Sequence, residues 1–141
     1  MTWMITTDPA NLLEPPFGYR PMAWLGLVTN SLVLPLALVL IRLDPAWRTA
    51  NIAVAAGALL PTAATGLVAS VALLRWRAWG QILAIVALSL SLAVGLPYGI
   101  VRLSLVQEGR SLLAVAAPAI WLLNVGALVY WCRPAHRRYL I

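Results

Sequence analysis

The stretch that decides the fold is residues 78–101, AWGQILAIVALSLSLAVGLPYGIV, which contains no charged residue. As a helix, 24 residues extend about 36 Å at 1.5 Å per residue, enough to cross a hydrocarbon layer of about 30 Å. Three further charge-free stretches, residues 21–41, 49–74 and 111–132, bring the charge-free share to two thirds of the chain. The sequence therefore predicts an all-α membrane protein with four transmembrane helices.

The chain of 141 residues, with a mean hydropathy of +0.89, has room for four spans and little else. We expect one four-helix transmembrane domain covering residues 1–141, with spans at about residues 22–42, 50–74, 79–102 and 111–132. The connections between these spans are short, which favours antiparallel packing of consecutive helices. The expected architecture is an up-down four-helix bundle.

The arginines indicate the orientation of the chain. All ten cationic residues are arginines, and four spans would place six of them on the side of the two termini and four on the other side. The positive-inside rule then predicts cytoplasmic termini, in a multi-pass protein of the cell inner membrane or of a thylakoid or intracytoplasmic membrane. Five arginines are expected to contact lipid headgroups: Arg75, Arg77, Arg133, Arg137 and Arg138.

Small residues recur at four-residue spacing in the two middle spans, where they allow close approach of helix backbones. We expect a packing seam between the second and third spans, and the alternative is a dimer face. The seam would use Gly66, Ser70, Ser91, Gly95 and Gly99.

Two asparagines lie at similar depth in the first and last spans. Asn30 and Asn124 are expected to form an intramembrane polar pair, which is worth about 0.6–2 kcal/mol in a bilayer. The alternative is a polar layer that holds a substrate, a water or a pigment substituent, with Trp121 as its aromatic wall.

Each span also contains one proline: Pro35, Pro61, Pro97 or Pro118. We expect these prolines to bend the helices, and the alternative is a gating hinge. Before the first span, Trp3, Phe17 and Tyr19 are expected to anchor a proline-rich segment on the membrane surface.

The charge-free stretches lack the ionisable groups that ion coupling and haem ligation use in membranes. No nucleophile-base pair or metal-ligand set is visible, so we expect the chain not to be an enzyme. Its basic character is assigned to the membrane boundary rather than to nucleic acid. The single cysteine, Cys132, cannot form an intrachain disulfide, and His136 is expected to be solvated or to lie among headgroups.

Two segments carry a family resemblance. The sequences RWRAWGQILAIV (residues 75–86) and WCRPAHRRY (residues 131–139) resemble a loose group of small four-span bacterial integral membrane proteins, mostly of unassigned function. In that group a basic-aromatic turn opens the third span and a similar basic tail closes the chain. The resemblance covers roughly the C-terminal half and implies a membrane location rather than an activity.

Two functions fit these expectations. The first is an accessory or structural integral-membrane subunit of a larger complex, such as a photosynthetic or respiratory one. Its expected partners are lipids and other membrane subunits, with no nucleic acid and no soluble substrate. No cofactor is predicted beyond bound lipid, with chlorophyll or carotenoid contact if the complex is a photosystem. The alternative is a small homo-oligomeric channel or carrier for a neutral or lipid-like substrate.

Overall fold

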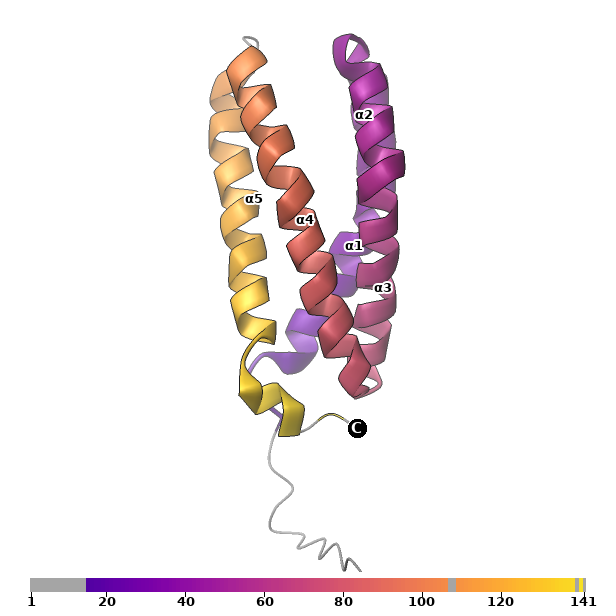
Figure 1. Ribbon diagram of the computed structural model, residues 1–141, viewed down its shortest axis with the longest axis vertical. Helices are drawn as coiled ribbons and strands as arrows, with labels where there is room; N and C mark the ends of the chain where they lie inside the picture. The colour runs from indigo at the N-terminus through magenta and orange to yellow at the C-terminus, as the bar shows by residue number, and fades with distance from the viewer. Residues whose placement is uncertain (1–14, 107–108, 139, 141) are drawn as a thin grey trace, which may run out of the picture.

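A computed structural model describes residues 15–106, 109–138 and 140, and all regular structure in this part of the chain is helical (Figure 1). Four helical segments are long and apolar enough to cross a membrane, which confirms the prediction of an all-α, multi-pass architecture. Their bounds are α1 (Tyr19–Leu43), the composite segment Pro45–Leu74, α4 (Ala78–Leu105) and α5 (Arg110–Trp131). Helix α1 starts three residues before the first expected span, 22–42. Helix α4 ends three residues after the third expected span, 79–102.

The second span is a composite of four helical segments. A 3-10 turn, η2 (Pro45–Trp47), leads into α2 (Arg48–Val54), a π-helical turn, η3 (Ala55–Leu59), and α3 (Leu60–Leu74). Within the π turn the Leu60 amide donates to the Ala55 carbonyl, five residues earlier. A proline at position 61 has no N–H to donate and its ring crowds the preceding turn, so the wider π turn directly before it has a physical cause. The other three spans keep their prolines within continuous α-helices.

Helix packing follows chain order. The main contacts join α1 to α3, α3 to α4, and α4 to α5, and Figure 1 shows α4 between α5 and α3. The residues buried between helices are mostly alanines, such as Ala23, Ala69 and Ala84, so the backbones approach closely. Large apolar side chains instead face outward along all four spans, as expected for a lipid-facing surface.

The α3–α4 turn is a Schellman motif with tryptophan in the position that glycine usually occupies. The Trp76 amide donates to the Leu73 carbonyl, and the Arg77 amide donates to the Ala72 carbonyl, both at 2.9 Å. Trp76 has φ 59°, a left-handed conformation that costs a non-glycine residue about 1 kcal/mol or more. Its ring stacks on that of Tyr19, with centroids 4.6 Å apart, so the tertiary contact offsets the local strain.

Candidate functional site

An ion pair joins two helices at the end of the molecule opposite the α3–α4 turn (Figure 1). Asp44 follows the last residue of α1, and its carboxylate lies 2.5 Å from a terminal nitrogen of Arg102 in α4. The two side chains are only 24% and 17% exposed. Ionisable residues in membrane-spanning helices are costly and usually pair with each other, and their presence marks a functional-site candidate.

Three more side chains extend this pair into a polar cluster. Tyr98 donates a hydrogen bond to the Asn51 amide oxygen, and Arg102 donates to that oxygen at 3.4 Å and to the Tyr98 hydroxyl at 3.3 Å. The guanidinium also lies 5.0 Å from the centroid of the Trp47 ring, within cation–π range. We call Asp44, Trp47, Asn51, Tyr98 and Arg102 the ion-pair cluster.

Two hydrogen-bond donors of the ion-pair cluster have no acceptor among the described residues. Asn51 is 8% exposed, and its amide nitrogen has no partner among the described residues. The Arg102 Nε atom is likewise buried without a partner in this part of the chain. Both groups are donors, so the cluster can bind a water or another hydrogen-bond acceptor.

Sequence reasoning missed this cluster because it treated Arg102 as the boundary of a span. In the structure α4 runs on to Leu105, which brings the guanidinium onto the same helix face as Tyr98, one turn earlier. The i, i+4 spacing of these two residues was the available signal. Nothing in the sequence pointed to Asp44, which lies 58 residues from Arg102.

Aromatic residues gather at the end of the molecule that contains the α3–α4 turn. Tyr19 is almost fully buried, contacts the edge of the Trp131 ring, and donates its hydroxyl hydrogen to the Leu73 carbonyl at 2.8 Å. The expectation of a surface anchor was wrong for Tyr19, because the first turn of α1 packs between the ends of α3 and α5. The Phe17 side chain is fully exposed, and Trp3 lies outside the described residues. We call Tyr19, Trp76, Tyr130, Trp131 and His136 the aromatic cluster.

His136 is 1% exposed, contrary to the expectation of a solvated or headgroup position. It lies in the short helix η4 (Pro134–Arg138), which folds the tail back so that the imidazole packs against Tyr19, Tyr130 and Trp131. Its Nδ1 atom is 3.1 Å from the Arg133 carbonyl, and its Nε2 atom has no partner among the described residues.

The two small-residue stripes face different helices instead of each other. In α3 the stripe faces α1: a side chain added at Gly66 would overlap the Asn30 amide, and the Ser70 hydroxyl lies 2.7 Å from where a Cβ on Gly26 would be. The seam expected between the second and third spans is, on this side, a seam between the first and second.

The α4 stripe faces α5. Ser91 accepts a hydrogen bond from Asn124 at 2.9 Å, and the Gly95 carbonyl accepts one from the Trp121 indole at 3.3 Å. A Cβ on Gly99 would lie 2.5 Å from the Trp121 ring. These three residues therefore form a second seam, between the third and fourth spans.

The contact between α3 and α4 uses a glycine that sequence reasoning did not single out. A Cβ on Gly80 would lie 2.8 Å from the Ala72 Cβ and 2.9 Å from the Leu73 amide nitrogen. Close to this point the Gln81 amide donates to the Trp131 carbonyl at 2.6 Å, which joins the start of α4 to the end of α5.

Asn30 and Asn124 do not pair with each other. The Asn30 amide donates to the Gly26 carbonyl of its own helix at 2.7 Å, while Asn124 bonds to Ser91 as described above. Similar depth in two spans was insufficient for pairing, because α1 packs mainly on α3 and α5 mainly on α4.

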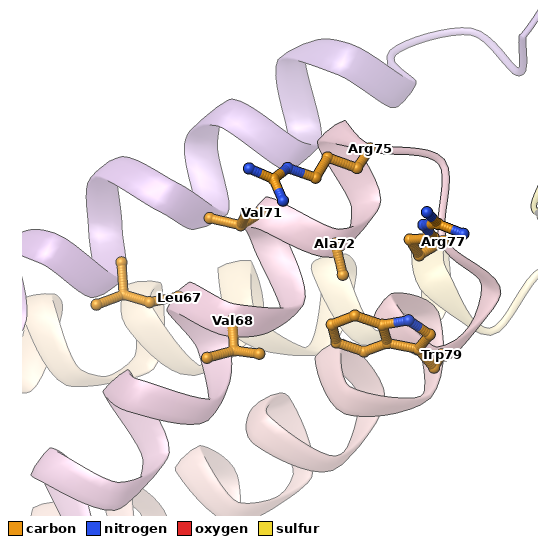
Figure 2. A pocket seen from close by; sticks show the side chains of 7 residues that line it. All are labelled: Leu67, Val68, Val71, Ala72, Arg75, Arg77 and Trp79. Carbon is orange, nitrogen blue, oxygen red and sulfur yellow. The ribbon is translucent and has the colours of Figure 1, made fainter.

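The expected headgroup arginines lie near the aromatic cluster. Arg75 and Arg77 flank Trp76 in the α3–α4 turn, and Arg133 and Arg137 follow α5; all four are exposed. The side chain of Arg138 lies outside the described residues. Arg75 and Arg77 line the turn end of a groove on α3 and the start of α4 (Figure 2).

The chain was compared with known proteins at three levels. No family model matches it, and no curated protein and no solved structure matches it.

Proposed function

We propose that this chain is an accessory or structural integral-membrane subunit of a larger membrane complex, such as a photosynthetic or respiratory one. It acts by helix packing and lipid contact. In this proposal the helices form an up-down bundle with both termini in the cytoplasm.

The observation that carries the proposal is how the chain uses its polar groups. The Asn124 and Gln81 amides and the Tyr19 hydroxyl bond to neighbouring helices or their ends. The hydroxyls of Thr29, Ser31, Thr65, Ser70 and Ser104 bond to carbonyls of their own helices. Such bonds stabilise and position helices, and they leave few groups to act on a substrate.

The outer face of α5 provides a surface for a partner. This helix packs mainly against α4, and its outward side chains Leu112, Val115, Leu122 and Leu123 are 73–77% exposed. A membrane subunit can pack on such a face through van der Waals contact alone. We assign this face to the partner and not to bulk lipid alone.

The orientation rests on the charges at the two ends. Arg20, Arg75, Arg77, Arg133 and Arg137 are exposed near the aromatic cluster. At the opposite end Arg102 is paired with Asp44, which reduces the free positive charge there. The difference favours a cytoplasmic location of the end that carries the aromatic cluster.

The ion-pair cluster favours a second candidate function. The Asn51 and Arg102 side chains each have a hydrogen-bond donor without a partner among the described residues. They lie near one end of the helices, which pack in a row in the order α1, α3, α4 and α5. The span that contains Asn51 also contains the π turn η3. Such π turns are frequent at functional sites. In a homo-oligomer, the helix rows of several copies of this chain would surround a pathway for a neutral or lipid-like substrate.

Co-purification separates the two functions. An affinity tag at the amino terminus would be used to isolate the chain from its native membrane in a mild detergent. The subunit proposal predicts different membrane proteins in fixed stoichiometry with it. A symmetric oligomer of this chain alone would contradict the proposal and favour the carrier, whose transport in vesicles should then be lost in Arg102→Gln.

A further inference from the structure

A groove runs along one face of α3 and ends at the α3–α4 turn. Leu67, Val68, Val71 and Ala72 form its wall and floor, and Trp79 of α4 closes its side. Figure 2 shows Trp79 beside Ala72 and Val68, with Arg75 and Arg77 at the turn end. The apolar part therefore lies at membrane depth, and the cationic part lies at the boundary.

The size of the groove limits what it can hold. Its volume is about 320 Å³, the small end of the range of about 300–1,000 Å³ that ligand pockets span. It is also open on its outer side, toward lipid. A narrow, open, apolar groove along a helix fits one acyl chain better than a bulky ring system.

The charges at the turn end have no counterpart among the described residues. Neither Arg75 nor Arg77 makes a side-chain hydrogen bond or an ion pair with any described residue, and both are exposed. Arg77 is also the N-cap of α4, and the first-turn amides of a helix lack intrahelical partners. Two guanidinium groups beside the positive end of a helix dipole favour a phosphate.

We propose that this groove is a binding site for one anionic phospholipid. Its phosphate lies between Arg75 and Arg77, and one acyl chain lies along Val68 and Val71 against the Trp79 ring. The site prefers anionic over zwitterionic lipids. A zwitterionic headgroup carries a positive group of its own, which the two arginines repel. The proposal requires only that the chain is inserted in a membrane, so it holds or fails independently of any partner complex.

The test is a lipid titration of the purified chain in detergent, read by native mass spectrometry. The probes are dioleoylphosphatidylglycerol and dioleoylphosphatidylcholine. The wild-type chain should retain one phosphatidylglycerol in preference to phosphatidylcholine. The double variant Arg75→Gln/Arg77→Gln should bind phosphatidylglycerol about tenfold or more weakly, because arginines near anionic lipid contribute additively.

The matched control removes two arginines from the opposite end. Arg42→Gln/Arg48→Gln lowers the net charge equally and should leave phosphatidylglycerol binding unchanged. An equal loss in both double variants, or no loss in Arg75→Gln/Arg77→Gln, overturns the proposal. Competition by inorganic phosphate as effective as that by the lipid also overturns it, since the acyl chain would then contribute nothing.

A second pair of variants tests the groove without altering charge. Val68→Phe fills the groove and should weaken phosphatidylglycerol binding several-fold. Val129→Phe makes the same change on an exposed position of α5 and should not. If Arg75→Gln/Arg77→Gln loses its helical circular dichroism signal, the comparison of Val68→Phe with Val129→Phe tests the proposal in its place. Equal phosphatidylglycerol affinities of these two phenylalanine variants would contradict the proposal.

Discussion

Asp44 at the end of α1 and Arg102 in α4 form an ion pair across 58 residues of sequence, at the edge of the membrane-spanning region. Removal of one partner leaves a partly buried charge without compensation. We expect Asp44→Asn to lower the free energy of unfolding by about 2 kcal/mol. Thermal unfolding in detergent, followed by circular dichroism, measures this loss.

The control for this variant is Arg110→Gln, which removes an exposed arginine at the same end. It should leave the unfolding temperature within error of the wild type. The paired change Asp44→Leu/Arg102→Leu should recover part of the loss in Asp44→Asn, since it leaves no unpaired charge. Equal stability of Asp44→Asn and wild type would contradict a structural role for the pair.

The glycines of the two seams give a second prediction. Gly66→Ala should destabilise the chain because the new methyl group overlaps the Asn30 amide, and Gly99→Ala because it overlaps the Trp121 ring. Overpacking of this kind typically costs about 1–3 kcal/mol. The two losses should add, since the glycines lie in separate seams.

Gly126→Ala is the matched change, because nothing lies within 4 Å of a Cβ at that position of α5. It should be neutral or stabilising by up to about 1 kcal/mol through helix propensity. The same unfolding assay tests all three variants, and a Gly126→Ala variant as unstable as Gly66→Ala would argue against specific seams.

Cysteine cross-linking tests which helices the asparagines join. In a Cys132→Ser background, cysteines at Ser91 and Asn124 should cross-link on oxidation, because the native side chains touch. Cysteines at Asn30 and Asn124 should not, since their hydrogen bonds run to other residues. The opposite pattern on non-reducing gels would restore the pairing expected from sequence.

Two substitutions at Trp76 separate the cost of its left-handed backbone from the contribution of its stacked ring. Trp76→Ala loses the stack on Tyr19 and keeps the strain, whereas Trp76→Gly loses both. The alanine variant should therefore be less stable than the glycine variant by about 1 kcal/mol. Both should be less stable than wild type, because an aromatic pair contributes about 0.5–1.5 kcal/mol beyond its buried area. Equal unfolding temperatures for Ala and Gly would indicate an unstrained turn.

The sequence was sufficient to predict the helical spans and insufficient to predict their partners. Uncharged runs of 21 to 26 residues leave few options other than membrane helices. The glycines at positions 66 and 99 marked the closely packed faces correctly. A small side chain permits close approach by any helix, however, so the pattern could not distinguish α1 or α5 from the neighbouring middle span.

The two clusters were harder to predict for a different reason. The ion-pair cluster depends on α4 continuing past the uncharged run, and the burial of His136 depends on how η4 folds under α5. Both are tertiary outcomes at helix ends, where hydropathy changes gradually and boundaries are least certain from sequence.

Site-specific photocross-linking in the native membrane tests the central claim most directly. A benzophenone amino acid at Leu123 lies on the outer face of α5, and the same group at Ala69 lies in the buried core. The account predicts that Leu123 yields an adduct with a different integral-membrane protein, of one defined mass, and that Ala69 yields none. Adducts from Leu123 that contain only lipid or a second copy of this chain would contradict the account.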